Sequence, residues 1–384
     1  MFKCIIGADL VPTESNISSF ARADVETLIG EDIKKLLNTA DFTIFNLEVP
    51  LTDLSTPIKK CGPNLIAPTK TIAGLKAINP HFFTLANNHI LDQGEQGLKS
   101  TITLLDEHGI AYAGAGKDLA SAAKPYILER EGKKIGIYCC AEHEFTIATE
   151  NTPGANPFDP LNSLDHVMEL KSQCDYVIVL YHGGKEHYRY PSPYLQKVCR
   201  KLVDKGTDIV VCQHSHCIGC EEKWHEGTIV YGQGNFLFDA CDNEFWNTSL
   251  LIELKIDKNI KVNYIPLYKD ENKVRLAEQK IKNRIIQDFD FRSAQIADIN
   301  LVESKYKEFA ELMFMTYRSR FAGRISENIL FRIINKLSGH RFAKHFFDYS
   351  YSSEALLAIQ NFIECEAHRE LLIKGIKDYY IKRN

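Results

Sequence analysis

The stretch His81-Phe-Phe-Thr-Leu-Ala86 is a short apolar run of the kind that forms a buried β-strand, and the polar residues Asn87-Asn-His89 follow it directly. Similar runs recur up to residue 231, and helical patterns separate most of them. Strands that alternate with helices predict an α/β fold with buried strands. The other predicted strands are residues 2–8, 42–47, 135–140, 176–181, 209–212 and 228–231.

The helical patterns between these strands share a spacing of apolar residues close to 3.6. In the last of them, Leu195, Val198 and Leu202 recur at that spacing, and Gly206 stands where a helix C-cap is expected. The predicted helices are residues 32–37, 97–108, 161–173 and 194–205.

The pattern changes after residue 236. Two neighbouring strands are predicted at residues 250–256 and 262–267, and the chain reads as helical from about residue 275. One long helix is predicted at residues 353–380.

We therefore predict two parts, a domain at residues 1–272 and a helical C-terminal extension at residues 273–384. The amphipathic helices of the extension could pack on their own domain or on a second copy, so a homo-oligomer is one possible state.

The composition is that of an ordinary globular protein, with 45% hydrophobic residues and a net charge of −4 over 384 residues. This charge argues against a nucleic-acid-binding protein, whose domain is normally basic. No apolar stretch approaches the roughly 20 residues of a transmembrane helix, and the first residues lack the pattern of a secretory signal. Cysteines within apolar runs, such as Cys139 and Cys212, indicate a reducing compartment, so we expect a cytoplasmic protein.

Polar residues that can bind a metal stand at the ends of five predicted strands. In open α/β sheets, ligands bind beyond the carboxyl ends of the strands, so these side chains are predicted to meet at one edge. Taken singly, each has a plainer interpretation: Asn87 and Asn88 could form only a turn, and a lone histidine is most often a half-exposed polar group. The set comprises Asp9, Asn46, Glu48, Asn88, His89, His182, His214 and His216.

Carboxylate, imidazole and amide oxygen together suit a divalent ion such as manganese, iron, zinc or magnesium. Two such ions, about 3.5–4 Å apart, would share a bridging carboxylate and could activate a water between them. Glu48 is the natural bridge. The predicted metal ligands are Asp9, Glu48, Asn88, His182, His214 and His216.

The string Leu85-Ala-Asn-Asn-His-Ile-Leu-Asp-Gln-Gly94 resembles the signature of the CapA family of capsule and poly-γ-glutamate synthesis proteins. The family is related to the calcineurin-like metallophosphoesterases. The resemblance covers roughly residues 2–270, and it implies a four-layer sandwich of two mixed β-sheets flanked by helices. Further matching pieces are Asn46-Leu-Glu48, Gly114-Ala-Gly116, His182-Gly-Gly-Lys-Glu186, His214-Ser-His216 and Gly234-Asn-Phe236.

The same resemblance implies roles for these residues. Asp9 and His216 would hold the first metal, Glu48 would bridge, and Asn88, His182 and His214 would hold the second. His89 would be the catalytic histidine that serves the leaving oxygen, and Asp92 would orient it. The residues expected to contact substrate or line its site are Asn46, Lys59, Lys60, Glu186 and Asn235.

Two departures from the family pattern are visible. Val11 stands where the phosphoesterases usually have the histidine of an Asp-x-His motif, so the first metal position loses a ligand. Residues 63–68 lack the arginine that relatives often carry there, and Lys59 or Lys60 would have to supply that anion contact.

Two functions are consistent with these patterns. The first is a metal-dependent hydrolase that acts on an anionic small molecule or polymer in capsule or polyglutamate-type metabolism, through a water activated by two metals. The second is an accessory protein that binds an anionic polymer during its synthesis with little or no turnover. The near-complete set of site residues favours the first, whereas Val11 and the added helices favour the second.

Overall fold

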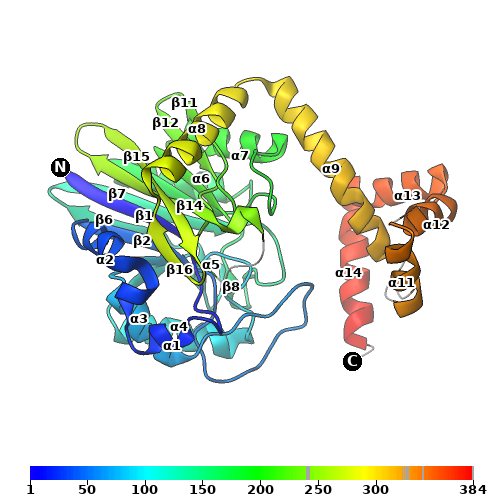
Figure 1. Cartoon of the computed structure of the whole chain (residues 1–384), viewed down its shortest axis with the longest axis horizontal. Coiled ribbons are helices and arrows are strands. Elements are labelled where there is room, and N and C mark those ends of the chain that lie inside the picture. The colour runs from blue at the N-terminus through cyan, green and yellow to red at the C-terminus, as the bar shows by residue number, and fades with distance from the viewer. Residues whose placement is uncertain (239–242, 322, 324, 326–327, 340, 383–384) are drawn as a thin grey trace. The chain divides into compact units, whose positions relative to one another are not determined.

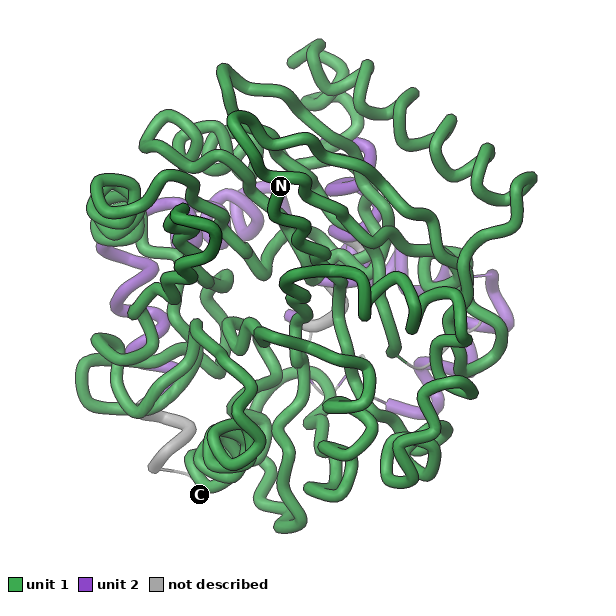
Figure 2. Tube along the Cα trace, turned by 90° about the vertical axis from the view of Figure 1, so that its left-hand side faces the viewer, with its two compact units in different colours: residues 1–306 green, residues 307–384 purple. Residues whose placement is uncertain are grey.

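The computed structural model describes residues 1–238, 243–321, 323, 325, 328–339 and 341–382. The chain forms two compact units, Met1–Tyr306 and Lys307–Asn384, which Figure 2 shows in different colours. The boundary at residue 272 that the change of pattern suggests stays a prediction. Of the described helices, none is both long enough and apolar enough to cross a bilayer.

Unit 1 contains two mixed sheets and a two-stranded ribbon, β5–β8. The larger sheet has the order β16-β15-β14-β1-β2-β3-β4, and β13 also pairs with β1. The smaller sheet has the order β11-β12-β10-β9-β7-β6. The strands are β1 (Phe2–Leu10), β2 (Phe42–Leu47), β3 (Phe82–Thr84), β4 (Ala111–Ala113), β5 (Ala115–Gly116), β6 (Tyr126–Arg130), β7 (Lys133–Ala141), β8 (Gly154–Ala155), β9 (Tyr176–His182), β10 (Ile209–Gln213), β11 (Glu221–Trp224), β12 (Gly227–Tyr231), β13 (Asn235–Leu237), β14 (Thr248–Ile256), β15 (Ile260–Asp270) and β16 (Lys273–Leu276).

The helices confirm the four helical patterns between the strands; three have ends within three residues of the prediction, whereas α2 begins seven residues before the predicted residue 32. Gly206 directly follows the C-cap of α7 and has a φ of +108°, the left-handed region that favours glycine. The helices are α1 (Ile17–Ala21), α2 (Val25–Asn38), α3 (Ile72–Ala77), α4 (Gly94–Glu107), α5 (Leu119–Ala122), α6 (Ser163–Gln173), α7 (Pro193–Asp204), α8 (Gln279–Gln295), α9 (Ile299–Phe321), α11 (Ile329–Leu337), α12 (Arg341–Ser350), α13 (Ser353–Glu364) and α14 (Glu366–Lys382), with 3-10 turns η1 (Thr69–Thr71) and η2 (Glu244–Trp246).

The predicted four-layer sandwich is confirmed, and the alternation of side chains along each strand explains it. In β1, Cys4 and Ile6 point into a core shared by the two sheets, whereas Ile5 packs on the other side against helical residues such as Leu28 of α2. In β9, the residues that face away from the shared core pack with those of α7, including Leu202. The order is therefore helices, sheet, sheet, helices (Figure 1).

Two predictions for the C-terminal part are wrong. The chain is not helical from residue 275, because β16 pairs antiparallel with β15 and buries Val274 in the core, and α8 begins only at Gln279. The single helix at residues 353–380 is broken at Cys365, whose ψ of 118° is extended, and α13 and α14 are packed against each other. In the first case long-range strand pairing overrides the local preference.

Gly114, between β4 and β5, lets the chain pass close to β7 and to the segment after β3, and we expect Gly114→Ala to destabilise unit 1 by about 2–5 kcal/mol. Its φ is +91°, and an added Cβ would lie 2.6 Å from Cys139 Cβ and 2.7 Å from Ala86 Cβ. The free energy of unfolding in urea measures the effect. Gly109→Ala is the matched control, because Gly109 has a φ of +66° but no neighbour within 4 Å of an added Cβ. Equal losses in both variants would show that the close approach contributes nothing.

Candidate metal centre

The parallel strands of the two sheets have their carboxyl ends on the same side of unit 1, and the predicted ligand residues lie there. In the larger sheet, Asp9 at the end of β1 is paired in register with Asn46 of β2. In the smaller sheet, His182 at the end of β9 is paired with Gln213 of β10. Because His214 follows Gln213 directly, residues from both sheets converge on one buried cluster.

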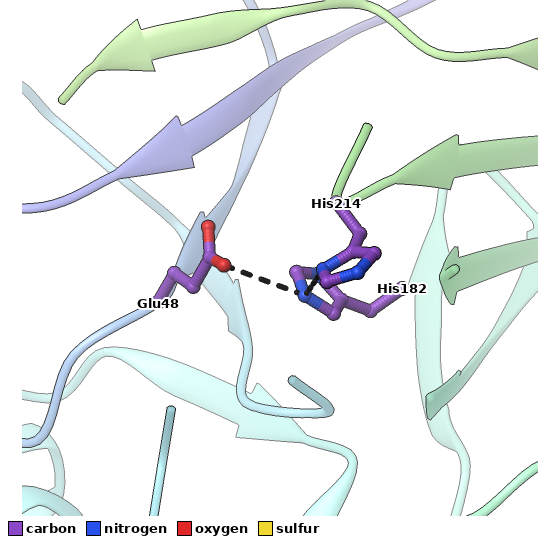
Figure 3. Close-up of side chains that lie close together, drawn as sticks. All are labelled: Glu48, His182 and His214. Carbon is purple, nitrogen blue, oxygen red and sulfur yellow. Dashed lines mark hydrogen bonds and ion pairs between the residues drawn. The ribbon is translucent and has the colours of Figure 1, made fainter. Parts of the chain in front are cut away.

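One group of potential metal ligands consists of Glu48, His182 and His214, shown in Figure 3. Their ligand atoms all lie within 4.8 Å of one another. His182 Nε2 is the centre of the group, 3.4 Å from Glu48 Oε1, 3.1 Å from His214 Nδ1 and 3.0 Å from Asn88 Oδ1. Four donor atoms thus converge from separate segments, as metal ligands do.

A second group consists of Asp9, Glu48 and His216, with the same upper limit of 4.8 Å between ligand atoms. His216 Nδ1 lies 3.5 Å from Asp9 Oδ2. His214 and His216 have φ values of 78° and 53°, which are unfavourable for residues other than glycine. Strain of this kind costs roughly 1–3 kcal/mol per residue and persists where the surrounding structure holds the loop in place.

The carboxylates of Asp9 and Glu48 test whether this cluster suits a cation. Both side chains are fully buried, at 0% exposure. Asp9 Oδ2 and both oxygens of Glu48 accept no hydrogen bond from any described residue. Buried carboxylate oxygens without such partners are costly unless a cation compensates them. The donor set of each group therefore fits a divalent cation, and Glu48 belongs to both groups.

The pKa values of the cluster reflect the burial of its ionisable groups and their closeness to one another. Burial and the neighbouring Glu48 raise the pKa of Asp9. Burial opposes ionisation of Glu48, but His182 and His216 outweigh it and hold the pKa of Glu48 below its usual range. Against its own burial, His216 has its pKa raised to about 9 by Asp9. Because metal ligands bind in deprotonated form, cation binding here would release protons.

His89 lies beside the cluster and is oriented by Asp92. His89 Nδ1 is 2.6 Å from Asp92 Oδ2. Because an ionised carboxylate only accepts hydrogen bonds, this contact fixes the proton on Nδ1 and leaves Nε2 as the second functional nitrogen. Asp92 Oδ2 also accepts a hydrogen bond from Leu65 N at 2.6 Å, which fixes the carboxylate.

Lys60 forms an ion pair with Asp92 and donates to the carbonyl oxygen of Asn88 at 3.1 Å. Its side chain is only 2% exposed. Lys60 thus contacts Asp92, the hydrogen-bond partner of His89. Its predicted contact with substrate stays a prediction. Lys59 and Glu186 are exposed, and their predicted roles are likewise untested.

Asn46 and Asn235 lie within the cluster, and their predicted contact with substrate stays a prediction. Asn46 Nδ2 donates to Asp9 Oδ1 at 2.7 Å, and His216 Nδ1 lies 2.8 Å from Asn235 Oδ1. Asn235 Nδ2 makes no hydrogen bond to the described part of the chain. Both amides therefore orient a ligand residue.

Sequence reasoning missed several neighbours of the cluster. Glu144 lies 3.4 Å from Asn88 Nδ2 and 3.9 Å from His214 Nε2, and Glu142 accepts a hydrogen bond from Gly184 N at 3.1 Å. Both glutamates follow the end of β7, so the rule applied to the other strand ends would have found them. The ring of Trp246, 4.7 Å from that of His216, carries no comparable signal because it belongs to the isolated turn η2.

This chain is similar to known bacterial proteins over the part that contains the ligand cluster. The model of a family described as bacterial capsule synthesis protein PGA_cap matches residues 5–240. The chain is 28% identical over 243 residues to the PGA biosynthesis protein CapA of Bacillus subtilis, and 29% identical over 216 residues to the capsule biosynthesis protein CapA of Bacillus anthracis. The matches cover 60% and 54% of this chain and 62% and 53% of those proteins, less than two thirds of either relative.

Among solved structures, a phosphatase from Mycoplasma pneumoniae is similar with a TM-score of 0.45 and 14% identity, covering 70% of this chain and 94% of that one.

Proposed function

Because this chain belongs to the PGA_cap family of bacterial capsule synthesis proteins, we propose that it is a metal-dependent hydrolase acting on an anionic polymer of the capsule or polyglutamate type. One observation carries the proposal. Two groups of buried ligands share Glu48, whose carboxylate oxygens have no hydrogen-bond partner among the described residues.

In this proposal Asp9 and His216 would hold one divalent ion, His182, His214 and Asn88 would hold the other, and Glu48 would serve both. The ligand mixture is compatible with manganese, iron, zinc or magnesium. Ions bound there would supply an activated water and would stabilise negative charge on the reacting group.

The side chains around the ions would complete the chemistry. Asp92 accepts the Nδ1 proton of His89, so Nε2 of the imidazolium form is the atom that would give a proton to the leaving oxygen, leaving the neutral ring protonated on Nδ1. Lys60 forms an ion pair with Asp92 and so helps to fix the position of the carboxylate that orients His89.

Exposure indicates the side from which a substrate would approach. Asp9 and Glu48 are fully buried, whereas Asn88, His89 and His214 retain a small exposed fraction. The carboxylates therefore form the floor of the site, and the later residues form its open side.

A second candidate function is polymer binding without turnover. Val11 favours it, because this buried apolar side chain stands where the phosphoesterase pattern has a ligand. The first position nevertheless keeps three donors, the number with which many catalytic metal sites operate. Metal content after purification and manganese-stimulated cleavage of bis-p-nitrophenyl phosphate and of poly-γ-glutamate separate the two candidates, since the second predicts polymer binding with no cleavage.

We expect His214→Ala to reduce the bound metal from two equivalents to about one while the fold is kept, because His214 belongs to only one of the two ligand groups. Elemental analysis by mass spectrometry gives the stoichiometry, and circular dichroism checks the fold. His225→Ala is the matched control, because this histidine is 68% exposed and lies beside Asp204, away from the cluster. Unchanged stoichiometry in His214→Ala would refute the assignment.

A further inference from the structure

A pocket of about 400 Å³ in unit 1 is distinct from the ligand cluster. Apolar side chains of α8, Ile281 and Ile285, line one part of it. Arg189, Arg292, Ile218 and Asn247 also line it. The pocket is therefore partly apolar and carries positive charge.

Two guanidinium groups in this pocket converge on the same loop. Arg189 Nη1 donates to the carbonyl oxygen of Ile218 at 3.1 Å, and Arg292 Nη2 donates to the same oxygen at 3.3 Å. Arg292 Nε donates to the carbonyl oxygen of Gly219 at 2.8 Å. The guanidinium of Arg189 also lies over the ring of Phe245, 4.7 Å from its centroid. Of the five N–H donors on each guanidinium, the hydrogen bonds to described residues use one of Arg189 and two of Arg292, so both groups are held in place with further donors directed elsewhere.

Two carboxylates, Asp288 and Glu244, also line the pocket, and Asp288 offsets part of the charge of Arg292. Within the described ranges, no carboxylate lies within ion-pair distance of either guanidinium. Asp288 lies 3.8 Å from Arg284 instead, and Glu244 is exposed. Burial and the nearby Arg189 lower the pKa of Arg292, as expected where like charges are held together. An anion between them would offset this repulsion.

Three segments connect this pocket to the metal cluster. Trp246 packs on His216 and donates a hydrogen bond to His187 at 2.9 Å, so His187, His216 and Trp246 form one wall beside the cluster. One or two residues further along each segment, Arg189, Ile218 and Asn247 line the pocket. Two residues of extended chain span at most about 7 Å.

We infer that this pocket is an anion subsite, in which Arg189 and Arg292 bind a carboxylate or phosphate of the same substrate whose bond lies at the metal cluster. This inference rests on the proposed function for the identity of the substrate. A polymer with an anionic group on each unit suits the arrangement, because one unit can occupy the cluster while its neighbour occupies the pocket. A single guanidinium often binds a carboxylate or phosphate through two parallel hydrogen bonds.

The test is a titration of the full-length chain with γ-linked tetraglutamate and, separately, with inorganic phosphate, each in manganese and in chelator. We expect Arg189→Gln to weaken binding of one of these probes at least about tenfold, with unchanged metal content. The probe that responds identifies the anion as carboxylate or phosphate. Arg284→Gln is the matched control, because it removes a charge from the same pocket at a side chain that is 85% exposed and beside Asp288, and we expect less than about a twofold change.

Equal effects of Arg189→Gln and Arg284→Gln on both probes, or no binding of either probe by the unaltered chain, would overturn the inference. Should Arg189→Gln fail to fold, Arg189→Lys keeps the charge but loses the forked donors, and wild-type affinity in that variant would also overturn it. These outcomes differ from failure of the proposed function, which would be seen as missing metal or missing turnover while binding still depends on Arg189.

Discussion

Glu48→Gln is expected to abolish binding of both metal ions and to reduce hydrolysis to the uncatalysed level. Glu48 is shared by the two ligand groups, so one substitution removes the bridge from both positions. The neutral amide has nearly the same shape, but it lacks the charge that a pair of cations requires. Metal analysis and the rate of phosphodiester cleavage measure the two losses.

The stability of the metal-free protein distinguishes this effect from misfolding. Glu48→Gln should still unfold in one cooperative transition in chelator, because the amide keeps the shape of the side chain, but the loss of its charge beside His182, 3.4 Å away, should lower the melting temperature. Glu253→Gln is the control, because buried Glu253 pairs with Lys3 at 3.2 Å. That variant should lose stability and keep both metals. Retention of two equivalents of metal in Glu48→Gln would refute the bridging role.

His89→Asn is expected to lower kcat by about 10²–10⁴ with unchanged metal content, the range for loss of a general acid. The loss should be smaller for a p-nitrophenyl ester than for an alkyl ester, because a good leaving group needs no proton. Rates with both esters at saturating substrate measure this difference.

Asp92→Asn is the accompanying variant, since it leaves the imidazole in place and replaces a carboxylate by a neutral amide, whose NH2 can donate to Nδ1 and so no longer fixes the proton there. It should show the same dependence on the leaving group with a smaller loss. Equal losses for both esters would show that His89 does not protonate the leaving oxygen.

Much of the candidate site could be predicted from the sequence because the carboxyl ends of parallel strands lie at the same edge of a sheet. The residue after a buried strand must emerge at the carboxyl edge, so Asp9 and His216 could be brought together from sequence positions far apart. The same rule also predicts that Glu144, which follows β7, lies at this edge.

Other features depend on packing that a local pattern does not contain. The burial of Lys60 follows from its ion pair with Asp92, in a segment with no regular structure of its own. Trp246 and Arg292 reach their positions through η2 and α8, which lie outside the alternating strands and helices. The break at Cys365 is preceded by no proline or glycine that could have indicated it.

The central position of β1 has a consequence for biosynthesis. One edge of this strand pairs with β2, but the other pairs with β13 and β14, which are made much later. At about 5–20 residues per second, the roughly 240 residues between β1 and β14 take on the order of ten to fifty seconds to translate. Throughout that interval one side of an apolar strand stays open on the nascent chain, where chaperones can shield it. The strand carrying Asp9 thus completes its pairing only after nearly all of unit 1 has left the ribosome.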